Sequence, residues 1–315
     1  MQVKQVFHRH SRGERQETSK RRQVLGWVAV GLSIAITCGW AFWGIIETFH
    51  EGWYYASWLA NVGLMLAQYL SPMLGLMGVA LVAIRWPRVG AGLHVALALF
   101  VAWFFGVHKN TVILLLLLPL VGIGALYWFG RPKPRRLALC LAIGLPILTL
   151  IAFGFAPARR VAQRLDDGVL QARRVRGHAV DLVWAPDGPG WPRDGMDWFE
   201  AHNVCHCLDD DGLTLAAYPQ NIWRLPTVDE AVRSMALHGE NCHGVWSASE
   251  ARAIYAMTPD KESPLWNTHS QVIYWWTGTE IDRDRAHMIA YDGKVWPRQK
   301  RFGPAYLGFR CVREP

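Results

Sequence analysis

The side chains whose types and spacing most suggest chemistry are four cysteines and two histidines in the C-terminal half. Thiolates and imidazoles are the ligands that zinc prefers in proteins. Ligands that are adjacent on one helix cannot all face a single ion, however, and an even number of cysteines in an exported domain is typical of disulfides. We therefore expect structural disulfides, with a zinc site as the alternative. The residues are Cys205, His206, Cys207, Cys242, His243 and Cys311.

Acidic residues offer two further candidate sites. The turn Asp209–Gly212 presents oxygen atoms of the kind that calcium binds, although such an acidic turn is usually a solvated helix end. Glu280, Asp282 and Asp284 alternate with arginines, which is typical of a salt-linked loop rather than of an acid–base pair. The sequence therefore predicts no catalytic residue, no metal ligand and no cofactor.

Aromatic and basic residues near the end of the chain are candidates for ligand binding. Most tryptophans of the C-terminal half should fill its core, and Trp266 and Trp296 are expected on loops, where an indole face can stack on a sugar ring or a peptide. Arg298, Lys300 and Arg301 form a basic loop beside Trp296. That loop suits an acidic glycan or a lipid headgroup, and a simple solvated loop is the alternative.

The elements that must position these residues divide the chain into two unlike halves. Residues 24–157 are almost continuously apolar, although the mean hydropathy of the whole chain is only slightly positive. About 20 apolar residues are needed to cross a bilayer as a helix. We predict an all-α transmembrane bundle of five helices, which serves as an anchor or docks a membrane partner. The predicted spans are 24–46, 56–84, 91–107, 111–129 and 137–155.

Basic residues indicate how the chain is oriented. The formal net charge is +8, and its lysines and arginines gather in the N-terminal segment 1–23 and in alternate short loops between the spans. This distribution follows the positive-inside rule, so the excess charge requires no nucleic acid partner. The pattern predicts a multi-pass protein of the cell membrane with a cytoplasmic N-terminus and an extracytoplasmic C-terminal domain.

The C-terminal half reads as a stalk over 158–178 followed by an α+β domain over 179–315. Asp197 and Thr227 each precede a glutamate by three residues, a capping-box spacing that predicts two helix starts. Strands are expected over 179–184, 272–276, 287–291 and 307–312, with Asp292-Gly293 as a turn between two of them.

Four segments in this order carry a resemblance to a known family: Trp198–Ala201 with Cys205, Trp223–Thr227 with Glu230, Tyr274–Thr277, and Gly308–Arg313. Over residues 180–313 the chain resembles the Lcl C-terminal domain family. That family is related to the formylglycine-generating, or sulfatase-modifying, enzymes and to the C-type lectin fold. The membrane half has no counterpart in this resemblance.

The resemblance implies a C-type-lectin-like fold in which the first helix is tied to the last strand by Cys205–Cys311. Cys207–Cys242 is then the second expected pair. The formylglycine-generating enzymes use a redox-active cysteine pair near their C-terminal end, and here no second thiol lies close to Cys311. We therefore expect a binding protein of the bacterial envelope, with a glycan, an envelope peptide or a membrane protein as partner. An oxidase with an altered site and a structural subunit of a membrane complex are the alternatives.

Overall fold

The chain folds into two compact units. The structure, a computed structural model, describes residues 3–105 and 113–315. One unit, here the helical unit, comprises Met1–Phe49 and Val62–Ala158; the other, here the C-terminal unit, comprises His50–Asn61 and Arg159–Pro315. The division near residue 158 follows the change in composition. The assignment of residues 50–61 to the C-terminal unit does not follow from the sequence pattern.

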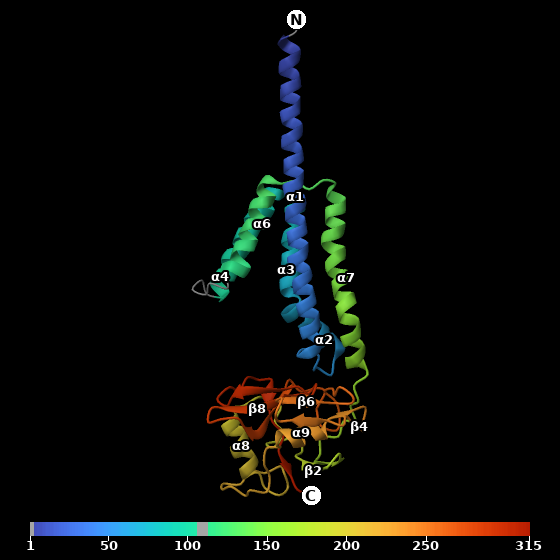
Figure 1. The fold of residues 1–315 in the computed structure, drawn as a ribbon, viewed down its shortest axis with the longest axis vertical. Helices are drawn as coiled ribbons and strands as arrows, with labels where there is room; N and C mark the ends of the chain where they lie inside the picture. Colours follow the sequence, from blue (N-terminus) through green and yellow to red (C-terminus); the bar gives the residue numbers. More distant parts are fainter. Residues whose placement is uncertain (1–2, 106–112) are drawn as a thin grey trace. The chain divides into compact units, whose positions relative to one another are not determined.

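The helical unit consists of helices that run alternately in opposite directions (Figure 1). Prolines and wide π-helical turns interrupt the apolar sequence, so that helix α2 reaches helix α3 through one such turn and helix α6 is preceded by another. The elements are α1 (Val3–His50), α2 (Trp58–Leu64), η1 (Met65–Tyr69), α3 (Ser71–Arg85), α4 (Pro87–Phe105), η2 (Ile113–Leu117), α6 (Leu118–Phe129) and α7 (Arg135–Ala162). The last residue of α1, the first four of α2 and the last four of α7 belong to the C-terminal unit.

Within the described residues, three helical stretches are long and apolar enough to cross a membrane: Glu17–His50, Pro87–Phe105 and Arg135–Ala162. A fourth is added if Trp58–Tyr69 and Ser71–Arg85, which meet at a bend of 61°, are one broken span. The remaining expected span, 111–129, is represented by the shorter helix Leu115–Phe129. Its beginning and the end of the expected span 91–107 lie outside the described residues.

Small residues let the helices of this unit approach closely. A Cβ atom added to Gly90 would lie 2.1 Å from the Cα of Ala83, so α3 and α4 meet at a point where only glycine fits. The buried hydroxyl groups of Ser33 and Tyr127 lie 3.3 Å apart and join α1 to α6. His94 is buried, and its Nδ1 lies 2.8 Å from the carbonyl oxygen of Gly90. These contacts are those of a packed bundle.

The C-terminal unit is a mixed α+β structure of small sheets and two short helices. A three-stranded antiparallel sheet has the order β1-β2-β11, and a four-stranded sheet has the order β10-β7-β8-β9. The larger elements are β1 (Arg173–Gly177), β2 (Val180–Trp184), α8 (Trp198–Cys207), α9 (Val228–Ser234), β7 (Tyr274–Glu280), β8 (Arg285–Ala290) and β9 (Val295–Gln299). The shorter strands are β3 (Ala236–Leu237), β4 (Glu240–Asn241), β5 (Val245–Ser247), β6 (Arg252–Ile254), β10 (Leu307–Gly308) and β11 (Val312–Arg313).

The two predicted helix starts are confirmed. The Asp197 side chain accepts a hydrogen bond from the Glu200 backbone N–H and caps α8. Thr227 and Glu230 form a complete capping box at the start of α9. Each cap satisfies backbone donors that have no partner within the helix, so these local patterns determine where the helices begin.

Two features differ from the sequence prediction. The expected stalk over 158–178 is not a separate element, because α7 extends to Ala162 and β1 pairs with β2 along its full length. Strand β9 was not predicted, since Pro297 lies within it. Proline lacks the N–H that a central strand must donate, but β9 lies at the edge of its sheet, where that donor is not needed.

Tryptophans are prominent in the core of the C-terminal unit. Trp184, Trp223, Trp275 and Trp276 are almost completely buried. Arg310 is also buried: its Nε donates to the Ala185 carbonyl at 2.7 Å, and its guanidinium lies 3.6 Å from the centre of the Trp191 ring. Burial holds the pKa of Arg310 well below its usual value. The expected prominence of tryptophan in the core is therefore evident.

Cys205 of α8 forms a disulfide with Cys311. The other expected pair is wrong, because Cys207 and Cys242 are free thiols. Cys242 packs with α9 residues in one aromatic cluster, whereas Cys205 and Cys311 belong to a second cluster, and Cys207 lies half-exposed at the end of α8. Residues two positions apart on an α-helix point to nearly opposite faces, so pairing of Cys205 does not bring Cys207 to Cys242.

Replacement of Cys205 by serine should lower the free energy of unfolding by about 2–5 kcal/mol, because the bridge closes a loop between residues 106 positions apart. Thermal unfolding of the full chain in detergent measures this change. Cys207→Ser, two positions along the same helix, is the matched control and should leave the midpoint unchanged. Equal midpoints for both variants would show that the bridge does not stabilise the unit.

Candidate functional site

Three consecutive charged residues are buried in the C-terminal unit. Asp260, Lys261 and Glu262, here the charged triplet, have exposed fractions of 2%, 2% and 1%. An ionised side chain is costly to bury unless it is paired and hydrogen-bonded. The partners of the triplet therefore indicate which segments this part of the molecule is built to hold.

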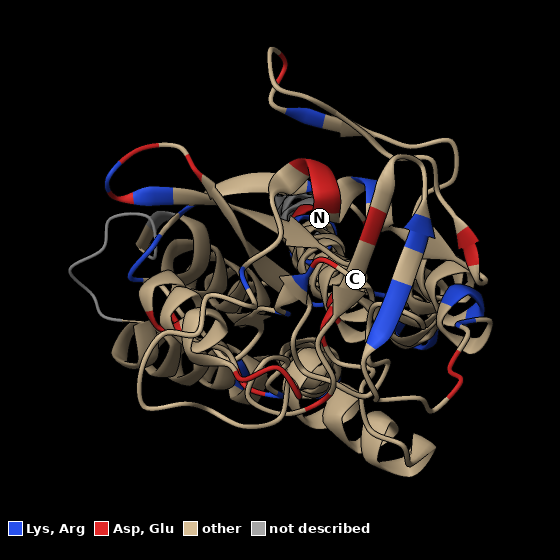
Figure 2. Cartoon of the chain, turned by 90° about the horizontal axis from the view of Figure 1, so that it is seen from below, with Lys and Arg blue, Asp and Glu red and all other residues tan. Residues whose placement is uncertain are grey.

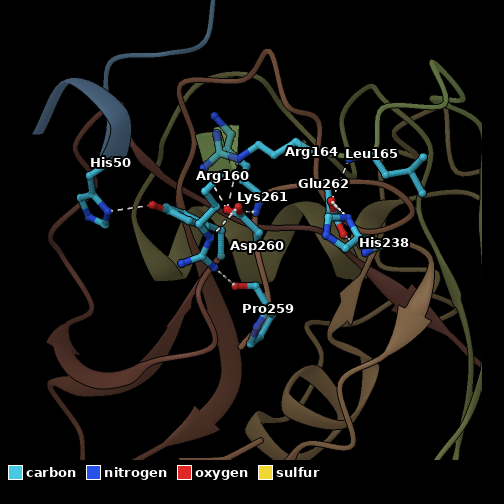
Figure 3. A network of polar contacts seen from close by, with 10 residues as sticks. His50, Arg160, Arg164, Leu165, His238, Pro259, Asp260, Lys261 and Glu262 are labelled. Carbon is cyan, nitrogen blue, oxygen red and sulfur yellow. Dashed lines mark hydrogen bonds and ion pairs between the residues drawn. The ribbon is translucent and has the colours of Figure 1, made fainter. Parts of the chain in front are cut away.

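Asp260 binds two arginines near the end of α7. Arg160 Nε donates to its Oδ2 at 2.8 Å, and Arg164 Nη2 donates to its Oδ1 at 2.9 Å (Figure 3). Arg160 Nη2 also donates to the carbonyl oxygen of Pro259 at 2.6 Å. Two cations thus compensate one buried carboxylate, and they attach residues 160–164 to the loop that carries the triplet.

Glu262 attaches the next residues of the chain. Its Oε2 accepts a hydrogen bond from the Leu165 backbone N–H at 2.8 Å, and its Oε1 accepts one from the backbone N–H of His238. The Nδ1 of His238 lies 3.4 Å from the same carboxylate. Glu262 therefore joins the segment after α7 to the turn between β3 and β4.

Lys261 is the third member of the triplet, and its Nζ donates to the carbonyl oxygen of Ser270. Burial, assisted by the positive charge of Arg164, lowers the pKa of Lys261 to about 7, against an opposing effect of Asp260. A carbonyl partner satisfies an amine in either protonation state. The amine therefore holds the loop around Ser270 in place without requiring a full charge.

Residues 50–61 are held to the same region. His50 Nδ1 lies 2.9 Å from the Tyr291 hydroxyl, and its Nε2 lies 3.2 Å from the Tyr274 hydroxyl. The guanidinium of Arg164 lies 5.3 Å from the centre of the Tyr291 ring, within cation–π range. Burial raises the pKa of Tyr291, so its hydroxyl stays protonated and can donate to His50.

A partly open cavity of 250 Å³ lies within the C-terminal unit, beside the residues that Arg164 holds in place. Residues 53–61 form part of its lining, and the segments 161–166 and 268–269 form the rest. The residues that define its character are Trp53, Tyr55, Trp58, Arg164, Asp166 and His269.

Both aromatic and polar side chains line this cavity. Tyr55 and Trp58 have exposed fractions of 43% and 66%. Asp166 accepts a hydrogen bond from the Thr268 hydroxyl at 2.5 Å and lies 3.4 Å from His269 Nε2. Ligand sites typically combine apolar or aromatic walls with a few fixed polar groups. The arrangement suits a compact ligand that has one apolar face and several hydroxyl or amide groups.

The predicted aromatic ligand contacts lie elsewhere. Trp266 is not on the surface: it is 3% exposed and stacks on Trp275 with ring centroids 3.8 Å apart. Burial of that large ring stabilises the core. A single sequence does not show whether a given tryptophan is buried or exposed. Trp296 lies in β9 and is half-buried, with its ring edge-on to Tyr274.

The three basic residues of the predicted loop do not form one exposed basic surface. Lys300 is 2% exposed; its Nζ pairs with Glu280 and lies 4.6 Å from the centre of the Trp198 ring. Arg298 lies over Phe302, and Arg301 lies near Phe199. The prediction that Lys300 contacts a ligand is therefore wrong, because its amine is used inside the unit, while Arg298 and Arg301 remain candidates.

The sequence suggests two possible metal sites, the acidic turn for calcium and the cysteines and histidines for zinc. In the turn Asp209–Gly212, the carboxylate of Asp211 accepts hydrogen bonds from the backbone N–H groups of Leu213 and Thr214, and these bonds lower the pKa of Asp211. No group of three or more histidine, cysteine or acidic side chains placed to hold a metal ion is found among residues 3–105 and 113–315.

The sequence contains only a partial signal for the residues that build the cavity. Residues 53–58 are dense in aromatic side chains, and such density between two spans is typical of the membrane interface as well as of a binding site. The charged triplet has no such signal, because consecutive charged residues are usually exposed.

Replacement of Asp260 by asparagine should destabilise the C-terminal unit by about 3–5 kcal/mol, since the guanidinium of Arg164 would then be buried without its carboxylate. The unfolding midpoint of the full chain measures the loss. Asp282→Asn is the matched control, because it removes an exposed ion pair with Arg285 and should change nothing measurable. Similar midpoints for the two variants would mean that the Asp260 pairs do not hold the unit together.

Comparisons with known proteins provide no family for this chain. No protein-family model, no curated protein and no solved structure matches it. A proposal about function must therefore rest on the residues that line the cavity and on the helices that are long and apolar enough to cross a membrane.

Proposed function

We propose that this chain is a membrane-anchored recognition protein that binds a sugar ring of an envelope ligand in the cavity of its C-terminal unit. The observation that carries the proposal is the combination of Tyr55 and Trp58 with the polar side chains Arg164, Asp166 and His269 around one cavity. The resemblance to lectin-like domains over residues 180–313 points to the same class of function, although the four segments that carry it do not line the cavity.

The size and polarity of the cavity favour a sugar. Its volume of 250 Å³ lies just below the range of about 300–1,000 Å³ that is usual for small-molecule sites, so it holds one ring rather than an extended peptide. Apolar ring faces of sugars stack on indole and phenol rings, while hydroxyl groups bond to carboxylate, imidazole and guanidinium groups.

The charge distribution of the unit favours a neutral ligand over a polyanion. Blue and red segments are interspersed on its strands and loops (Figure 2). Several of these charges are paired with one another, such as Arg174 with Asp181 at 2.6 Å and Arg193 with Asp187 at 3.0 Å. A nucleic acid partner would instead require a basic face that follows the phosphates.

The C-terminal unit is proposed to lie outside the cytoplasm, after five membrane crossings. The backbone N–H of Arg131 donates to the Arg22 carbonyl at 2.8 Å, and Trp27 Nε1 donates to the Lys133 carbonyl at 2.9 Å. Two basic segments therefore lie at the same end of the helical unit, as the positive-inside rule requires of cytoplasmic segments. The disulfide in the C-terminal unit supports an oxidising compartment.

A membrane-impermeant maleimide should label Cys207 in right-side-out membrane vesicles without any reductant, because this thiol is free and half-exposed. Labelled peptides identified by mass spectrometry provide the readout, and Cys207→Ser removes the signal as the control. Labelling that appears only after the vesicles are permeabilised would place the unit in the cytoplasm.

Binding of the full chain in lipid nanodiscs to an array of immobilised envelope oligosaccharides tests the ligand class. Trp58→Ala should weaken binding about twofold to tenfold, because loss of one aromatic stacking surface costs about 0.5–1.5 kcal/mol. Trp58→Phe keeps an aromatic face and should retain most of the affinity. Tyr218→Ala is the control, since Tyr218 is 78% exposed and does not line the cavity.

Two outcomes would contradict the proposal. Equal binding by the native chain and Trp58→Ala would place the sugar site outside this cavity. Binding of envelope peptides with no binding of any oligosaccharide would exclude a sugar ring as the ligand.

A further inference from the structure

The helical unit contains a cavity of its own, with a volume of 530 Å³. Residues of α1, α3, α4, η2 and α6 line it, so it is built within this unit alone. Its volume lies within the range of about 300–1,000 Å³ that is usual for small-molecule sites.

The cavity has a buried floor and an exposed rim. Leu120 on the floor is 6% exposed, whereas Phe100, Phe104 and Leu115 on the rim are 54%, 65% and 67% exposed. Such a cavity opens away from the core of the unit. In a membrane-spanning bundle, apolar side chains that face away from the core contact lipid.

Irregular helix geometry creates the space. Pro72 and Pro119 both line the cavity, and each is the second residue of a helix that comes after a π-helical turn. Prolines and π-helical turns bend helices and widen them locally, which prevents close packing along the full length.

Water is a poor occupant of this cavity. Among the described lining residues, the side chains that carry a nitrogen or oxygen atom are Ser71 and Trp40. A buried water molecule typically needs two to four polar partners, so an apolar cavity of this kind holds hydrocarbon in preference.

We propose that this cavity binds one acyl chain of a bilayer phospholipid. A helix of about 10 Å diameter occupies roughly 400 Å³ per turn. The cavity therefore accommodates little more than one turn of a docked helix, too short a contact for a second copy of the chain. A flexible acyl chain fits this volume, and the surrounding bilayer supplies it at high concentration.

The affinity for the acyl chain must come from the shape of the cavity, because lipid tails are as apolar as its lining. The lining includes Gly75 of α3, and a Cβ atom added there would meet no atom within 4 Å. Gly78, one turn further along α3, has the same open surroundings but does not line the cavity. The two glycines therefore provide a cavity-filling variant and its matched control.

The experiment uses the full chain in vesicles of phosphatidylethanolamine and phosphatidylglycerol that contain a phosphatidylethanolamine with a diazirine on its acyl chain. After illumination, adducts should concentrate on the lining residues of α3, α4 and α6. Gly75→Phe should reduce these adducts roughly tenfold, the ratio expected for a loss of about 1.4 kcal/mol, whereas Gly78→Phe should not reduce them.

Several results would overturn this inference. Equal adduct yields in both variants, or adducts spread evenly over the outer surfaces of α1 and α7, would indicate only the surrounding lipid. Loss of the adducts on addition of a polyisoprenyl phosphate would assign the cavity to that chain. The position of the adducts in the native chain keeps the inference testable even if Gly75→Phe does not fold. This site is independent of the proposed sugar site, so either can fail without the other.

Discussion

The C-terminal unit depends on the neutralisation of two carboxylates that lie inside it. Asp260 and Glu262 are almost completely buried, and an ion left unpaired in such a place costs several kcal/mol, a large fraction of the stability of a typical domain. Three of their partners, Arg160, Arg164 and the backbone of Leu165, come from the end of α7 or closely follow it. The charges therefore force this segment of the chain into one defined position.

The same constraint creates the candidate site. Arg164 pairs with Asp260, and its guanidinium also lies over the ring of Tyr291. The Tyr291 hydroxyl is hydrogen-bonded to His50 at the end of α1. The residues that follow α1 and those that end α7 are thereby brought to one place, and they line one cavity. The lining of the cavity therefore combines residues that directly follow α1 with residues at and just after the end of α7.

The sequence predicted much of the architecture because the relevant signals are local. Continuous apolar stretches predicted a helical half, and capping residues Asp197 and Thr227 predicted where α8 and α9 begin. Such features depend on a few neighbouring residues and on the solvent around them. Strand β9 escaped prediction because Pro297 argues against a strand unless the strand is known to lie at a sheet edge, which is a property of the whole sheet.

The sequence by itself determined that this chain has an apolar helical half and an aromatic-rich α+β half with an even set of cysteines. Only the tertiary structure decided that Trp266 and Lys300 are core residues, that Cys207 and Cys242 stay unpaired, and that residues 50–61 join the C-terminal unit. The physical reason is that burial and pairing depend on segments far apart in the chain. A tryptophan or a lysine looks the same in the sequence whether its partner is water or the face of another ring.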